Sequence, residues 1–225
     1  MIIGKTYGHK SPVFEKEIKY VVIRPYWEVA PTIRRAEIVP PVEKDRNYIS
    51  NKDFEVVTLD EKILTDGPIN DKVLGQLKSG KLHVRQKPGP TNSLGLVKLI
   101  FSNDDNVYLQ GTEAPQLFND EERDLSHGCI RVQEPADLAA WALRHNPGWN
   151  FERVNGAQDN FTVVLEKPIP VLILYGTVVV DEKNSIFFFD DVYGYDKQLD
   201  EALQEGVSIS FFIGKNSPAE RLSAL

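Results

Sequence analysis

The feature that most constrains the fold of this chain is a series of short runs of β-branched and aromatic residues. Each run is bounded by glycine, proline, asparagine or aspartate, a pattern typical of strands that are separated by turns. The runs occupy residues 18–23, 54–59, 82–85, 96–101, 107–109, 161–165, 171–180, 186–189 and 207–212. The pattern predicts a core made mainly of β-strands, arranged as a sandwich of sheets.

Amphipathic helical segments are fewer than the strands. They are expected at residues 70–78, 136–144 and 197–204, and from residue 218 onward. We expect these helices to flank the sheets. The predicted fold class is therefore mixed α+β, mainly β.

The stretch between about residues 25 and 80 differs in composition from its surroundings. Prolines and charges are frequent there, and only one clear strand is expected. We interpret it as a small subdomain beside the sandwich, anchored by Trp27. A chain of 225 residues can bury a sizeable core as one domain, so we expect a single domain over residues 1–225.

The composition excludes several classes of protein. The content of 41% apolar and 26% charged residues is that of a globular chain. The longest apolar run, residues 168–180, is shorter than the roughly 20 residues of a membrane-spanning helix, so we expect a long buried strand there and no transmembrane segment. The 26 basic and 33 acidic residues give a net charge of −7, which argues against a nucleic-acid partner.

The first ten residues, MIIGKTYGHK, contain no apolar segment followed by a small-residue cleavage site. No export signal is therefore expected in this chain. On these residues alone, the protein either stays in the cytoplasm or is a fragment whose signal lies upstream.

The chain contains a single cysteine, Cys129, which excludes an intramolecular disulfide and a cysteine-rich metal site. It lies in the run Ser-His-Gly-Cys-Ile-Arg-Val at residues 126–132. Positive charge stabilises a nucleophilic thiolate, and His127 and Arg131 can supply it. Gly128 lets the backbone come close, so N–H groups near it are expected to hold an oxyanion. The alternative is that Cys129 is a small buried apolar side chain.

The run at residues 126–132 resembles the active-site signature of the L,D-transpeptidase (YkuD-type) family, in which Ser or Thr, His, Gly and Cys precede an apolar residue and Arg or Asn. The resemblance extends over nearly the whole chain, and it is greatest to a larger branch of the family with a capping subdomain. It implies a YkuD-type β-sandwich catalytic core with flanking helices and a small capping subdomain at approximately residues 25–80. Further matching stretches lie at residues 22–29, 31, 85–90, 92–95, 98, 107–109, 117–118, 148–150 and 168–171.

The resemblance implies an enzyme of peptidoglycan that acts in the periplasm or cell envelope. The Cys129 thiolate attacks a carbonyl on the L-centre of diaminopimelate in a stem tetrapeptide, releases the terminal D-Ala, and passes the acyl group to an amine of another stem. Carbapenems are expected to acylate the same thiol. The alternatives are a catalytically silent relative that binds cell-wall peptides, an L,D-carboxypeptidase, or an enzyme that links a protein to peptidoglycan. Because the family works outside the cytoplasmic membrane, the missing signal indicates a truncated chain.

The chain departs from the family at the general base. The family carries a histidine in a Tyr-Leu-His context, but 19 residues before Cys129 this chain has Gln110. An amide cannot accept a proton at neutral pH. Either His127 substitutes as the base, or weak activity relies on the small thiolate fraction of a thiol with a pKa of ~8.5. A third interpretation is that Gln110 was introduced on purpose or marks a silent relative.

Arg131 is assigned to substrate binding or to the orientation of the cysteine strand, through the fork of N–H groups on its guanidinium. The alternative is a surface ion pair with Asp124, Glu134 or Asp137.

Tyr108 and Ser126 are also assigned to the substrate site. Tyr108 is expected to face the nucleophile together with Gln110, because strand residues two apart share a face. No metal or cofactor is expected, since no two of the four histidines lie at ligand spacing with a carboxylate. The oligomeric state is not predicted.

Overall fold

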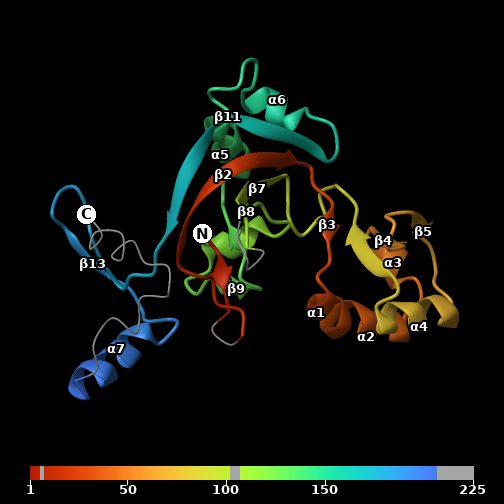
Figure 1. Ribbon diagram of the computed structural model, residues 1–225, viewed down its shortest axis with the longest axis horizontal. Coiled ribbons are helices and arrows are strands. Elements are labelled where there is room, and N and C mark those ends of the chain that lie inside the picture. The colour runs from red at the N-terminus through yellow and green to blue at the C-terminus, as the bar shows by residue number, and fades with distance from the viewer. Residues whose placement is uncertain (6–7, 102–106, 207–225) are drawn as a thin grey trace, which may run out of the picture. The chain divides into compact units, whose positions relative to one another are not determined.

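The computed structural model describes residues 1–5, 8–101 and 107–206, and the chain forms two compact units (Figure 1). The first unit is Met1–Ile173 and the second is Leu174–Leu225. This division differs from the single domain over residues 1–225 that the sequence predicts. The predicted strand at 207–212 and the helix from 218 lie outside the described residues.

The first unit is built on a five-stranded sheet of mixed direction. The long strands β2 and β11 pair antiparallel, β2 pairs antiparallel with β7, and β7 with β8, whereas β8 and β10 run parallel (Figure 1). Residues in β7 alternate between buried and partly exposed, which is the period of a strand with one face in the core. The order across the sheet is β10 (Ile130–Arg131), β8 (Leu109–Gln110), β7 (Val97–Phe101), β2 (Phe14–Ile23) and β11 (Phe161–Ile173).

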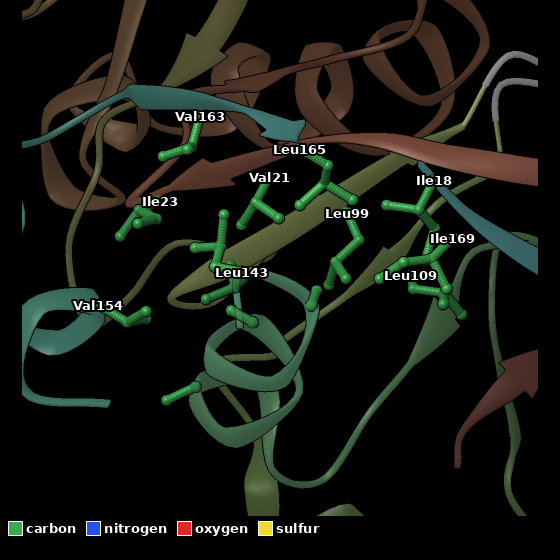
Figure 2. Packing of buried hydrophobic residues seen from close by; sticks show 14 of the residues in the cluster. Ile18, Val21, Ile23, Leu99, Leu109, Leu143, Val154, Val163, Leu165 and Ile169 are labelled. Atoms are coloured by element: carbon green, nitrogen blue, oxygen red, sulfur yellow. The ribbon is translucent and has the colours of Figure 1, made fainter. Parts of the chain in front are cut away.

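The main hydrophobic core lies between one face of this sheet and two helices, α5 (Pro135–Ala142) and α6 (Phe151–Asn155). Figure 2 shows Leu143, which directly follows α5, beside Val21 of the sheet, and Val154 of α6 belongs to the same cluster. The mixed α+β class is confirmed. Helices cover the buried face of the sheet where the prediction placed a second sheet.

A second hydrophobic cluster lies within residues 27–86, which we call the small-sheet region. It has its own four-stranded sheet, in which β4 is fully buried. The sequence predicts strands at 54–59 and 82–85 in this region, but it misses those at Trp27–Glu28 and Ile63–Thr65, because strands of two or three residues are too short to show a periodic pattern. The strands in order are β3 (Trp27–Glu28), β6 (His83–Gln86), β4 (Phe54–Val57) and β5 (Ile63–Thr65), and the helices are α1 (Pro31–Ile33), the π-helix η1 (Arg34–Ile38), α2 (Val39–Lys44), α3 (Tyr48–Asn51) and α4 (Asp71–Ser79).

The first unit also contains three short elements. The strands β1 (Ile3–Gly4) and β9 (Asp124–Ser126) pair in parallel, and η2 (Pro115–Asn119) is a 3-10 helix. Trp27 packs against Phe54 at 6.1 Å between ring centroids, as expected of an anchor of the small-sheet region.

The second unit contains a hairpin of β12 (Val178–Val180) and β13 (Ile186–Phe188), followed by α7 (Tyr195–Gln204). The prediction of one long buried strand over residues 168–180 is wrong. Strand β11 ends at Ile173, opposite Phe14, the first residue of β2, so the chain beyond it has no strand to pair with in the sheet. All residues of β12 and β13 are exposed.

The start of α7 is held by Asp191, whose carboxylate accepts hydrogen bonds from the backbone N–H groups of Tyr195 and Asp196, both at 2.9 Å. The Tyr175 hydroxyl donates to the same carboxylate at 2.7 Å. Burial, with the neighbouring Asp191, raises the pKa of Tyr175 to about 12. Within the described ranges, no helix has the length and apolar character needed to cross a membrane.

Candidate functional site

Cys129 lies in a loop between β9 and β10 that is tied down by buried hydroxyls. The Ser126 hydroxyl donates to the Cys129 carbonyl at 2.6 Å and accepts from the Gly128 N–H at 3.1 Å. Ser11 reaches the loop from the N-terminal segment and donates to the Gly128 carbonyl at 2.8 Å. Gly128 has φ of +107°, a conformation that favours glycine. Hydrogen bonds therefore hold the backbone on both sides of Cys129.

The register of three neighbouring strands places Lys98, Gln110 and Arg131 in a row across the sheet. Gln110 on β8 is paired with Lys98 on β7 and with Arg131 on β10. Paired residues share a face. Tyr108 directly precedes β8 and Cys129 directly precedes β10, and Lys98, Arg131 and the Tyr108 backbone all act on the Cys129 thiol, so these two residues extend the row on this face. We call it the site face. The opposite face carries the apolar core.

The electrostatics of the site face are those of a partly desolvated cluster. The Lys98 ammonium lies 3.8 Å from the centroid of the Tyr108 ring. Burial lowers the pKa of Lys98, against the opposing effects of Cys129 and Glu28. Burial raises the pKa of Cys129, against a hydrogen bond from the Tyr108 backbone and the charges of Lys98 and Arg131. A thiol and an amine thus influence each other in a site of low polarity.

Gln110 is buried, with 4% of its surface exposed. Its Nε2 donates to the Ser93 carbonyl at 3.5 Å, and its Oε1 has no hydrogen-bond partner within the described part of the chain. Gln110 therefore stands on the site face where the family's histidine is expected.

Arg131 donates through Nη1 to the Thr112 hydroxyl at 3.3 Å. Among residues 1–5, 8–101 and 107–206, no carboxylate lies within 4.0 Å of its guanidinium, so the alternative of a surface ion pair is not seen. The assignment of Tyr108 and Arg131 to substrate binding stays a prediction. The same holds for Ser126, whose side chain is engaged inside the loop.

His127 is held from outside the catalytic sheet. Its Nε2 lies 2.6 Å from Oε1 of Glu37, on η1 of the small-sheet region, and its ring contacts that of His9 edge-on at 5.0 Å between centroids. Sequence reasoning missed Glu37, which lies 90 residues away from His127. It also gave Lys98 no role, although a lysine between the buried Val97 and Leu99 marks the polar face of a strand.

A pocket of about 500 Å³ adjoins the site face. Glu37 and Ser93 are in its wall, and these residues contact His127 and Gln110. The remaining lining combines aromatic, acidic and amide side chains, from Trp27, Tyr48, Phe54, Glu113, Asn51 and Gln86 among others. Such a lining can receive an extended peptide that carries both ammonium and carboxylate groups.

Among the described residues, no group of three or more His, Cys, Asp or Glu side chains is arranged to hold a metal ion. The reactive groups of the site face are a thiol, an amine, an amide and a guanidinium, from Cys129, Lys98, Gln110 and Arg131. These groups suit nucleophilic acyl transfer by the thiol.

Comparisons with known proteins agree on one family. The sequence profile of YkuD, an L,D-transpeptidase catalytic domain, matches residues 1–180. A Haemophilus influenzae protein named "Putative L,D-transpeptidase" is 27% identical over 205 residues, which are 90% of this chain and 41% of that protein. The chain thus spans about two fifths of the length of this relative.

Proposed function

Because this chain belongs to the YkuD family of L,D-transpeptidase catalytic domains, we propose that it is a cysteine acyltransferase acting on peptidoglycan stem peptides in the cell envelope. The observation that carries the proposal is the placement of Cys129. Its thiol lies on the site face within the influence of Lys98 and Arg131, on a loop held by Ser126 and Ser11. A fixed nucleophile beside fixed charges suits covalent catalysis.

The proposed reaction has two steps, acylation of Cys129 and transfer of the acyl group to an amine. In the first, the Cys129 sulfur bonds to the carbonyl carbon at the L-centre of diaminopimelate, the bond from that carbon to the D-Ala nitrogen breaks, and D-Ala leaves with the thiol proton. In the second, the amine of another stem attacks the thioester, the new amide bond forms, and the amine's proton returns to the sulfur. No oxidant or metal is required.

The binding roles follow from the groups around the thiol. Arg131 and Tyr108 orient the substrate, and a guanidinium is suited to a carboxylate. N–H groups near Gly128 hold the oxyanion; since the Gly128 N–H now donates to Ser126, it must exchange that bond on substrate binding. The pocket that contains Glu37 and Glu113 receives the stem peptide, whose ammonium groups these carboxylates attract. The small-sheet region acts as the cap of this pocket.

Gln110 favours a second candidate, a relative that binds stem peptides without reacting with them. A buried amide in the place of the base can position a peptide, but it cannot accept the thiol proton. The two candidates differ in whether a covalent adduct forms.

Intact-mass measurement separates the candidates, because the chain has one cysteine. After incubation with a stem tetrapeptide or a carbapenem, we expect one adduct that is absent from Cys129→Ala. An unmodified mass under all conditions would rule out the acyltransferase and leave the binding module. Product analysis with and without an acceptor amine then distinguishes transpeptidation from hydrolysis to a tripeptide, and from attachment of a protein.

A further inference from the structure

The site face contains a basic side chain that can replace the missing histidine. Gln110 is an amide, a guanidinium such as that of Arg131 has donors but no acceptor, and Nε2 of His127 is bonded to Glu37 of the small-sheet region. Lys98 remains. It is the cross-strand partner of Gln110 and lies 3.8 Å from the centroid of the Tyr108 ring, while Tyr108 also contacts Cys129 through its backbone.

We propose that the Lys98 amine accepts the thiol proton of Cys129 during acylation and returns it to the leaving amine. The identity of the substrate rests on the proposed function above. The sharing of a proton between Lys98 and Cys129 does not depend on the proposed function, because it can be measured without any peptide.

The surroundings of Lys98 favour a neutral amine before the reaction. The side chain is partly buried, and no carboxylate lies within 4.0 Å of its ammonium in the part of the chain that the structure describes. Burial lowers the pKa of Lys98. An amine with a lowered pKa is a general base at a pH where an exposed lysine is fully protonated.

Three further titratable or charged groups, Tyr108, Glu28 and Arg131, act on the pair. The Tyr108 phenol has a pKa raised by burial, so at neutral pH it is an uncharged ring against Lys98. Glu28, on β3, favours the ammonium of Lys98 from a distance, and Arg131 favours the thiolate of Cys129. The pKa values of Lys98 and Cys129 are displaced in opposite directions by burial, which brings the amine and the thiol closer in proton affinity.

The Tyr108 ring can stabilise the positive charge that Lys98 gains when it takes the proton. When the amine takes the proton, the ammonium lies over the face of the Tyr108 ring, where a cation is attracted by the ring electrons. The thiolate is stabilised at the same time by the Tyr108 backbone and by Arg131. Both products of the proton transfer thus have a partner on the site face.

Lys98 and Cys129 together account for every proton that moves in the proposed reaction. During acylation the S–H bond of Cys129 breaks, an N–H bond forms on Lys98, and the sulfur bonds to the carbonyl carbon. When the C–N bond to D-Ala breaks, the Lys98 ammonium gives its proton to that nitrogen and is neutral again. In the second step Lys98 takes a proton from the attacking amine and passes it to the departing sulfur.

The test is the pH dependence of alkylation of Cys129 by iodoacetamide, followed by intact mass. We expect Lys98→Met to move the midpoint upward by about one pH unit or more, which lowers the rate near neutral pH about tenfold. Lys72→Met, an exposed lysine on α4, is the matched control and keeps the wild-type profile. A Lys98→Met profile that coincides with wild type would overturn the proposal.

A second variant separates a base from a mere positive charge. Lys98→Arg places a permanent cation beside the thiol, so its alkylation midpoint is expected at or below that of wild type, but an arginine cannot take up a proton. Release of D-Ala from a tetrapeptide is therefore expected to fall about 100-fold in Lys98→Arg. Release at the wild-type rate would refute the role of Lys98 as base. If Lys98→Met fails to fold by thermal melting, Lys98→Gln takes its place in the alkylation series.

Two combinations of results distinguish the Lys98–Cys129 pair from the proposed function. An alkylation shift in Lys98→Met together with no turnover in the wild-type chain supports the amine–thiol pair and contradicts the transpeptidase. Wild-type turnover in Lys98→Met supports the transpeptidase and contradicts the pair.

Discussion

Glu37 and His127 lie 90 residues apart in the chain, and their side chains meet at 2.6 Å between Oε1 and Nε2. Glu37 belongs to the small-sheet region, whereas His127 is two residues before Cys129, the proposed nucleophile. This hydrogen bond therefore fixes the orientation of the His127 ring and links the wall of the pocket to the cysteine loop.

The Glu37–His127 hydrogen bond gives a first prediction. Glu37→Gln keeps the size of the side chain but weakens its bond to the imidazole, so we expect acylation of Cys129 by a tetrapeptide to slow by about three- to tenfold. The control is Glu43→Gln, which removes a carboxylate on α2 that pairs with Lys78 away from the site. Equal acylation rates for Glu37→Gln and wild type would show that His127 needs no support from Glu37.

Gln110→His places an imidazole where the sequence resemblance predicts the family's base. We expect it to raise the acylation rate of Cys129 at least about tenfold, since a positioned general base contributes a factor of about 100 or more. The rate is measured from adduct formation by intact mass. In the Lys98→Met background, Gln110→His is expected to recover the lost activity, because either base can serve the same thiol. No gain in either background would mean that proton transfer does not limit acylation.

The raised pKa of Cys129 predicts a dependence of stability on pH. Burial makes the folded chain hold the thiol proton more tightly than the unfolded chain, whose thiol has a pKa of ~8.5. The free energy of unfolding should therefore fall as the pH rises from the unfolded pKa toward the folded pKa. Urea denaturation at a series of pH values measures this, and Cys129→Ala should lose that part of the slope. A slope shared by both proteins would assign it to other groups.

The hydrogen bonds of Ser126 lead to a prediction about the stability of the fold. Its buried hydroxyl makes two hydrogen bonds to the loop, so Ser126→Ala leaves the Gly128 N–H and the Cys129 carbonyl without this partner. We expect a loss of about 1–3 kcal/mol in the free energy of unfolding, measured by urea denaturation. Ser50→Ala, an exposed serine that donates only to the Asn47 carbonyl, is the control and should change stability little. A similar loss in both variants would contradict the proposed role of Ser126 in the loop.

Local patterns predicted a large part of the secondary structure. The helices expected at 70–78, 136–144 and 197–204 are confirmed as α4, α5 and α7, with ends that differ by one or two residues. The strands expected at 18–23 and 96–101 lie in β2 and β7. These elements are long enough for their apolar residues to repeat with the period of a helix or a strand.

The sequence by itself determined the family, the nucleophile candidate Cys129 and the departure at Gln110, because each can be read from contiguous residues. Only the tertiary structure decided that Lys98 shares a face with Cys129, that Glu37 reaches His127, and that the sheet ends at Ile173. The physical reason is that strand register and side-chain contact depend on which distant segments pair. A local pattern gives the face of a residue within its own strand, but it does not specify the neighbouring strand or the register between them.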